Sequence, residues 1–168
     1  MALMKDIKVS KVVLNIGLGK NVDRLDSAMI LAERLTECKP VKTLASRKAK
    51  TFKIGRGRVI GVKVTMRGPK SLDFLKKLFL AKGNTIKKSS FDREGNFNFG
   101  FEEYLEIPGV KYDPSIGIMG FNISVTLERP GFRIKRRKIQ KRKIPMTHRI
   151  SGEESTGFIK KKFGLEII

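Results

Sequence analysis

The chain has 168 residues and a formal net charge of +21, with 37 Lys and Arg against 16 Asp and Glu. This length suits one domain, and an apolar fraction of 40% can form a hydrophobic core. A single cysteine, Cys38, excludes an internal disulfide, and with a single histidine it argues against a structural zinc site. The start of the chain lacks the pattern of a secretory signal, and no apolar run is long enough to cross a bilayer. We therefore expect a cytoplasmic protein.

Two long segments of the chain contain basic residues and no acidic ones. Residues 39–70 hold eleven Lys and Arg, and residues 132–149 hold nine. Residues 92–128, between them, hold seven acids and two basic residues. Because a soluble surface normally mixes both signs, an acid-free segment indicates a partner that supplies the negative charge. Nucleic acid, an anionic membrane and an acidic protein are the three classes of partner that fit.

The first expected strand is Lys8–Asn15, which is rich in β-branched residues and partly alternates. Gly17 and Gly19 end this strand. Asp23 can cap a following helix that ends before Pro40. The apolar residues of that helix recur at amphipathic spacing, at Leu25, Ala28, Met29, Ala32 and Leu35.

Three short strands are expected in the first basic segment, at Val41–Ala45, Phe52–Ile54 and Val59–Met66. The last two are joined by Gly55-Arg56-Gly57-Arg58, whose glycines permit the positive φ angles of a hairpin turn. Apolar residues alternate along the third strand, so its other face is small, basic and able to donate hydrogen bonds. That second face consists of Gly61, Lys63 and Thr65 and continues to Arg67. It can lie against a phosphate backbone.

The second half of the chain alternates helices and strands. Pro69 suits the first position of a helix, and strands are expected at Asn96–Phe101 and Phe121–Leu127. Ser151 and Glu154 match a capping box that opens a terminal helix over residues 151–164. The sequence therefore predicts one compact α+β domain over residues 1–168. It has a mostly antiparallel sheet packed by helices, and a basic C-terminal arm over residues 132–149.

The glycine turn resembles a nucleotide-binding loop but fails the motifs. Gly17-Leu-Gly-Lys20 follows a strand and precedes a helix. The dinucleotide fingerprint needs a small residue at Val22, and a P-loop needs Gly at Leu14 and Ser or Thr at Asn21. We interpret the segment as a turn whose exposed amides, together with Asn15, face RNA.

The sequence contains no complete set of catalytic groups. His148 lies among cations and is expected to contact phosphate or to pack, and Cys38 is interpreted as a small apolar residue at a helix end. The adjacent Glu102 and Glu103 are interpreted as a surface turn that neutralises Lys111. Without a nucleophile, a base and an orienting group, we expect no enzymatic activity, no cofactor and no metal.

Short motifs follow one another along nearly the whole chain. They are Val12–Gly19, Cys38–Thr43, residues 52–57, Gly61–Gly68, Phe91–Phe101, Ile107–Gly117, Leu127–Gly131 and the arm ending at His148–Ser151. These motifs resemble the L five family of large-subunit ribosomal proteins, in its archaeal and eukaryotic branch. The resemblance implies an α+β fold with a curved sheet. It also implies a protein that binds 5S rRNA, anchors it in the central protuberance, reaches peptidyl-site tRNA through a hairpin loop, and touches the small-subunit head in an intersubunit bridge.

The resemblance also suggests which residues contact RNA, and Asn15, Thr65 and Arg67 match family positions that contact 5S rRNA. The expected rRNA-binding set, which adds nearby residues, is Asn15, Gly17, Gly19, Lys42, Arg47, Lys48, Lys63, Thr65 and Arg67. The tRNA-contacting loop, Phe52–Val59, would use Lys53, Gly55, Arg56, Gly57 and Arg58. The basic arm would contribute Arg133, Lys135, Arg136, Arg137, Lys138, Lys141, Arg142, Lys143 and Arg149. Cys38 replaces a Gln that is frequent in the family, so it is not included.

The expected partners are 5S rRNA, large-subunit rRNA, peptidyl-site tRNA, a small-subunit head protein and other central-protuberance proteins, with no membrane and no homo-oligomer. A small RNA-acting enzyme is an alternative, but it lacks a catalytic set. A peripheral membrane protein is another, but between Arg133 and Lys143 only Ile134 and Ile139 are apolar. The arm could be a disordered solubilising tail, and we expect it to become ordered on RNA.

Overall fold

The structure is a computed structural model that describes residues 4–19 and 21–168. Residues 1–3, on which the expected absence of a secretory signal partly rests, and Lys20 of the glycine turn lie outside the described residues. Five strands form an open antiparallel sheet in the order β2-β3-β1-β6-β5. The strands are β1 Lys8–Gly17, β2 Val41–Leu44, β3 Val59–Met66, β5 Phe97–Phe101 and β6 Phe121–Glu128. Each was predicted from the sequence to within two residues at either end.

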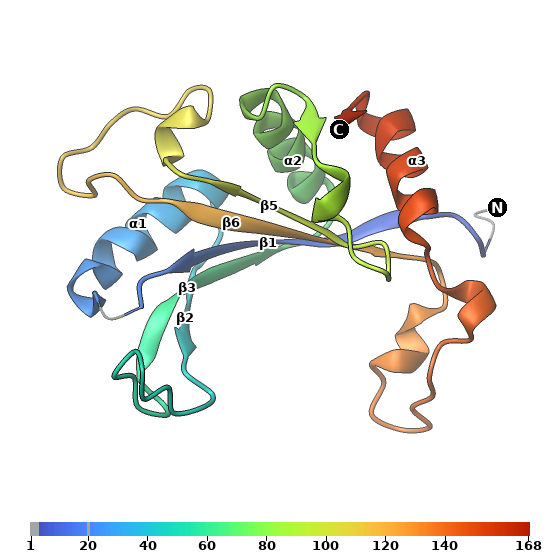
Figure 1. The fold of residues 1–168 in the computed structure, drawn as a ribbon, viewed down its shortest axis with the longest axis horizontal. Coiled ribbons are helices and arrows are strands. Elements are labelled where there is room, and N and C mark those ends of the chain that lie inside the picture. The colour runs from blue at the N-terminus through green and yellow to red at the C-terminus, as the bar shows by residue number, and fades with distance from the viewer. Residues whose placement is uncertain (1–3, 20) are drawn as a thin grey trace.

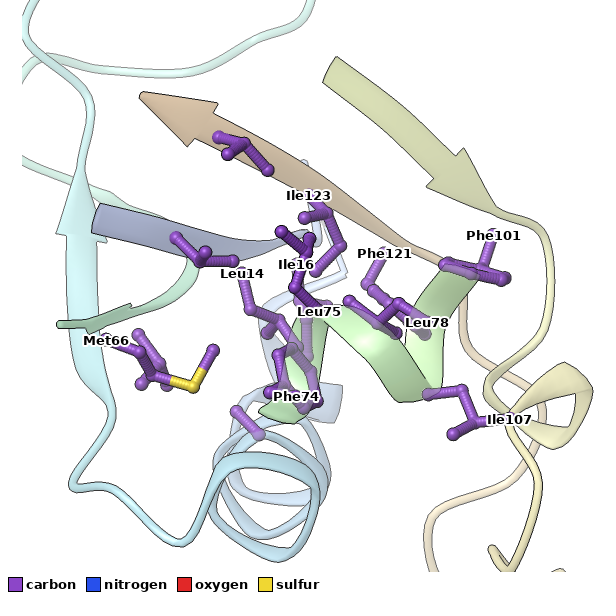
Figure 2. Close-up of a cluster of buried hydrophobic side chains, with 14 of the residues drawn as sticks. Leu14, Ile16, Met66, Phe74, Leu75, Leu78, Phe101, Ile107, Phe121 and Ile123 are labelled. Carbon is purple, nitrogen blue, oxygen red and sulfur yellow. The ribbon is translucent and has the colours of Figure 1, made fainter. Parts of the chain in front are cut away.

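One face of this sheet packs against the helices and forms the hydrophobic core. Helices α1 (Leu25–Thr36) and α2 (Pro69–Ala81) contribute to one buried cluster with the strands. Because successive side chains of a strand point to opposite faces, every second residue of β1 and β6 enters the core. Figure 2 shows Leu14, Ile16 and Ile123 pointing toward α2, where Leu75 and Leu78 are fully buried. The predicted α+β domain with a mostly antiparallel sheet is confirmed.

The helix ends test the capping signals of the sequence. Asp23 does not cap α1, because Val22–Arg24 form a 3-10 turn that runs into the helix and moves the N-cap to Arg24. Pro69 begins α2, as predicted. Ser151 caps α3 (Gly152–Phe163), also as predicted. Its Oγ accepts from the Glu154 amide at 3.3 Å, and the Glu154 carboxylate accepts from the Ser151 amide at 3.0 Å.

The predicted strand Phe52–Ile54 is wrong. Strand β3 pairs with β2 on one edge and with β1 on the other, so neither edge is free for a third partner. Residues 45–58 instead form a long loop between β2 and β3, in which Ala49 and Ile54 make a single antiparallel bridge. The loop is closed at its base by hydrogen bonds between Ala45 and Arg58 and between Gly57 and Ala45, each at 2.8 Å.

Several short elements had no signal in the sequence. Strands β4 (Thr85–Ile86) and β7 (Glu166–Ile167) form a small parallel pair that links the end of α2 to the end of α3. Further 3-10 turns lie at Lys88–Ser90, Tyr104–Glu106, Phe132–Lys135 and Met146–His148. Within the described ranges, none of the helices combines the length and apolar character needed to span a bilayer.

The loop of the first basic segment and the basic arm project from the same side of the sheet. In Figure 1, α2 and α3 lie on one side, while the loop 45–58 (teal) and the arm 132–149 (orange) extend on the other. Among the residues that the structure describes, no α-helix covers the sheet on that second side. We call the uncovered side the open face; it carries the outward side chains of β1, β3, β5 and β6.

Candidate nucleic-acid interface

The register of the strands places polar side chains in rows across the open face. Asn15 stands opposite Lys63 of β3 on one side and opposite Asn122 of β6 on the other. In the next row, Val13 stands between Thr65 and Ser124. Because directly opposite residues of antiparallel strands share a face, each row presents its side chains together.

This face offers hydrogen-bonding groups and hardly any free negative charge. The side chains of Asn15, Lys63 and Asn122 have no hydrogen-bond or ion-pair partner among the described residues. The carboxylate at its far end, Glu128, already accepts from Ser10 Oγ and from Arg136, each at 2.8 Å. The open face can therefore bind a polyanion and still offer unused amide groups to it.

Lys42 was expected in the same rRNA-binding set as Lys63, but it does not lie on the open face; its contact with rRNA stays a prediction. It stands opposite Val62, whose side chain is fully buried on the helix side of the sheet. Lys42 is exposed, but it points to the other face from Lys63. The reason is the two-residue period of a strand, since a residue's face depends on register and not on nearness in sequence.

The glycine turn is built differently from the sequence interpretation. The amides of Leu18 and Gly19 donate to the Ile60 carbonyl at 2.9 and 3.2 Å, so they are not free to face RNA. Gly19 has a φ of +58°, a backbone conformation that favours glycine. Gly17 and Gly19 therefore make a tight turn, and of this predicted group Asn15 is the residue with a free side chain on the open face.

Gly61 sets how closely β3 approaches its neighbour. A Cβ built on this residue would lie 2.3 Å from the Ile16 carbonyl oxygen of β1, a contact that cannot exist without moving backbone. It stands opposite Gly17 in the register. This end of the open face therefore carries two residues without side chains, and a ligand can approach the backbone there.

The loop 45–58 carries an exposed cationic surface with one exposed aromatic ring. Its basic residues are all exposed and comprise Arg47, Lys48, Lys50, Lys53, Arg56 and Arg58. Phe52 is 63% exposed. Positive φ angles at Lys53 (+52°) and Gly57 (+81°) turn the chain near the tip. An exposed ring among cations is a combination that can stack on a base while binding phosphate.

The arm 132–149 is also exposed and basic, and side-chain contacts tie it to the body. Arg136 pairs with Glu128, and Lys135 and Arg149 lie 3.5 and 3.8 Å from the Glu94 carboxylate. His148 packs against the arm, with Nε2 2.9 Å from the Pro130 carbonyl and its ring beside Phe132. These contacts hold part of the arm in place without RNA. The prediction that RNA orders the segment stays a prediction.

The other candidate chemical groups are in structural positions. Cys38 is half-buried against the core. Glu103 does not neutralise Lys111, since it caps the turn Tyr104–Glu106 together with Glu106. In the part of the chain that the structure describes, no three His, Cys, Asp or Glu residues gather into a group that could hold a metal.

Comparison with known proteins identifies the family. The family model described as Ribosomal protein L5 matches residues 3–54, and the model for the C-terminus of the same ribosomal family matches residues 59–154. The large ribosomal subunit protein uL5 of Sulfurisphaera tokodaii is 46% identical over 166 residues, covering 98% of this chain and 94% of the relative. The chain belongs to the ribosomal protein L5 family.

Two further relatives support the same family. The uL5 protein of Nanoarchaeum equitans is 46% identical and covers 98% of each chain, and that of Methanococcus vannielii is 43% identical, covering 98% of this chain and 93% of its own. As a member of the L5 family, this chain is a structural constituent of the large ribosomal subunit. The family recognised from the sequence motifs is confirmed. The RNA contacts of individual residues stay predictions.

One functional position of this L5-family chain was missed by sequence reasoning. Arg129 directly follows β6 and precedes the basic arm, yet its side chain is only 6% exposed. Its guanidinium donates to the carbonyls of His148 and Arg149 at 3.4 and 3.2 Å, and to the Glu154 carboxylate at 2.7 Å. The Ser151 amide, together with Arg129, holds the pKa of Glu154 below its ordinary value. Arg129 thus joins the sheet, the arm and α3, and nothing in its sequence context distinguishes it from a surface cation.

The L5-family chain also has an acidic lobe, residues 102–120, on the helix side of the sheet (Figure 1). Hydrogen bonds from Arg24 to the Ile118 carbonyl and an ion pair between Arg34 and Asp113 fasten it to α1 and the turn before it. The Ser115 side chain and amide, together with Arg34, lower the pKa of Asp113 to about 2. Tyr112 and Ile118 are more than half exposed. The lobe therefore presents apolar groups and carboxylates away from the basic segments.

Proposed function

We propose that this chain binds 5S rRNA through the open face and anchors it in the central protuberance of the large subunit. The observation that carries the proposal is the arrangement of charge and polarity. Unpartnered amide and hydroxyl groups cross the sheet, and the basic loop 45–58 and the basic arm 132–149 project beside them on the same side. This arrangement suits a folded RNA with exposed bases and irregular grooves.

The two kinds of group have different tasks. Lys and Arg of the projecting segments bind phosphates, which gives affinity and orientation without reading sequence. The amides of Asn15 and Asn122 can donate to and accept from base edges and 2′-hydroxyls. A basic surface alone would bind any RNA, so the preference for 5S rRNA depends on the side-chain amides of Asn15 and Asn122.

The loop 45–58 is the part that we assign to peptidyl-site tRNA. The family resemblance motivates the assignment, and the structure adds that the loop projects away from the sheet and exposes Phe52 beside Lys53 and Arg56. The glycines at 55 and 57 leave its backbone uncovered, so a nucleic-acid backbone can come close.

The acidic lobe is the part that we assign to the bridge with a protein of the small-subunit head. It lies on the side of the sheet opposite to the basic segments, where RNA phosphates would be repelled by its carboxylates. Exposed Tyr112 and Ile118 supply the apolar groups that a protein interface buries.

The proposed function is tested with a matched pair of lysine variants. Lys63→Ala removes a cation from the open face, and Lys42→Ala removes one from the opposite face of the neighbouring strand. Filter binding of purified protein to 5S rRNA should show a several-fold larger loss for Lys63→Ala. A structured RNA of equal length should bind more weakly than 5S rRNA. Equal losses in both variants would show that the open face is not the binding surface. Equal affinity for the two RNAs would show general affinity for polyanions and no preference for 5S rRNA.

A further inference from the structure

A solvent-open groove of about 750 Å³ lies between the far end of the open face and the basic arm. Its floor is apolar, because Leu127, Ile144 and Ile150 are buried there and Phe132 is half-buried. Seven Lys and Arg residues line it, against two carboxylates. This size is within the range of roughly 300–1,000 Å³ that small-ligand sites occupy.

The charges in the groove do not balance within the protein. Both carboxylates are already paired, Glu128 with Arg136 and Glu94 with Lys135 and Arg149. The side chains of Lys11, Lys141, Arg142 and Lys143 also line the groove and have no partner among the described residues. The groove therefore has an excess of positive charge, which a negatively charged ligand can neutralise.

The combination of an apolar floor and a cationic rim fits a nucleotide. A base has an apolar face that can lie on the Phe132 ring, and its phosphate can reach the lysines of the rim. The Phe132 ring is held from the side by His148, at a ring-centroid distance of 5.7 Å. An acidic peptide would satisfy the cations but would leave the aromatic floor uncovered.

We propose that this groove binds one unpaired nucleotide of ribosomal RNA, with its base on Phe132 and its phosphate between Lys141 and Lys143. The nucleotide must be unpaired, because the face of a base in a continuous helix is covered by its stacked neighbours. The inference rests on the proposed function, because it assumes that rRNA is the polyanion. It adds a specific binding site for a single base.

The test compares two RNA hairpins that differ by one bulged adenosine. Fluorescence anisotropy at one salt concentration gives the ratio of their dissociation constants for wild type and variants. Phe132→Leu keeps an apolar side chain and removes the ring. Lys141→Gln/Lys143→Gln removes two groove cations, and Arg133→Gln/Lys138→Gln removes two exposed arm cations that do not line the groove. Thermal melts by circular dichroism check that each variant is folded.

We expect wild type to prefer the bulged hairpin by roughly tenfold, which corresponds to about 1.4 kcal/mol. Phe132→Leu and the groove double variant should lose this preference, and the arm control should keep it while binding both hairpins more weakly. Three outcomes would overturn the groove proposal. Wild type could show no preference for the bulged hairpin, or folded Phe132→Leu could keep that preference. Polyglutamate, an acidic peptide used as competitor, could displace RNA equally from wild type and Phe132→Leu. If wild type shows no preference for the bulged hairpin but still prefers 5S rRNA, only the groove proposal is wrong. If wild type prefers none of the RNAs tested, the proposed function is wrong as well.

Discussion

Arg129 shows that a basic residue in a ribosomal chain can serve the fold. Its guanidinium satisfies two carbonyls of the arm and one carboxylate of α3, and it is buried. Replacing it with Met would leave these acceptors without their donor in a poorly hydrated place. We expect Arg129→Met to lower the free energy of unfolding by about 1–3 kcal/mol, measured by urea denaturation.

Arg133→Met provides the matched control for that measurement. Arg133 is exposed and its side chain has no partner among the described residues, so its loss should change stability by no more than about 0.5 kcal/mol. If the two variants were equally stable, the role assigned to Arg129 in joining the arm to α3 would be wrong.

Asp113 makes part of the stability depend on pH. Hydrogen bonds from Ser115 and the Arg34 guanidinium lower the pKa of Asp113 from 3.8 to about 2 in the folded chain. Since the folded pKa lies below the unfolded one, this stabilisation is fully present above about pH 4. It is lost as the pH falls through about 2. Wild type should therefore be more stable than Asp113→Asn at pH 5, and the gap should shrink toward pH 2. A gap that is constant over this range contradicts the assignment.

The loop 45–58 and the open face are separate elements, so their functions should separate as well. The side chains of Arg56 and Arg58 project from the loop, and neither has a partner among the described residues. Arg56→Ala/Arg58→Ala should leave 5S rRNA binding nearly intact and weaken peptidyl-site tRNA binding by reconstituted large subunits. Lys76→Ala/Lys77→Ala, on the solvent side of α2, is the charge-matched control. A collapse of 5S rRNA binding in the loop variant would show that the loop contacts 5S rRNA and that its assignment to tRNA is wrong.

Elements whose signals are local were predicted from the sequence, and those that depend on distant partners were not. The alternation of Val59–Met66 and the capping box at Ser151 involve neighbouring residues, and both are present in the structure. The strand expected at Phe52–Ile54 failed because β1 and β2, far apart in sequence, occupy both edges of β3. Two-residue strands such as β4 have too few residues to leave a pattern.

The candidate site divides in the same way. Asn15, Lys63 and Thr65 were expected together, and the register brings them to one face. Lys42 was expected with them but lies on the opposite face, since its position depends on how β2 is aligned with β3. Arg129 was missed because its burial results from packing of the arm and α3 around it. A linear sequence states neither alignment nor burial.

At the scale of the whole molecule, the charge is divided between two sides. The basic loop 45–58 and the basic arm 132–149 project from one side of the sheet, and the acidic lobe lies on the other. Phosphate contacts release counterions, so each contributes roughly 0.7–0.9 to the slope of log affinity against log salt concentration. Lys63→Ala should flatten this slope for 5S rRNA by that amount.

Asn15→Ala should act differently from Lys63→Ala in the same titration. Its amide carries no charge, so its loss should reduce affinity for 5S rRNA by about fivefold at every salt concentration, which corresponds to about 1 kcal/mol. The slope should stay unchanged. If Asn15→Ala flattened the slope as much as Lys63→Ala, the distinction between reading bases and binding phosphates on this face would not hold.

The row Lys63, Asn15, Asn122 crosses three adjacent strands, so the distance between strands sets the spacing of its side chains. Neighbouring strands lie about 4.8 Å apart, whereas bases stacked on one another are separated by only ~3.4 Å. Neighbouring side chains of the row therefore fall out of step with consecutive stacked bases. In the proposed complex this spacing would favour nucleotides that are splayed apart, so the sheet would discriminate against uninterrupted helices before any individual base is recognised.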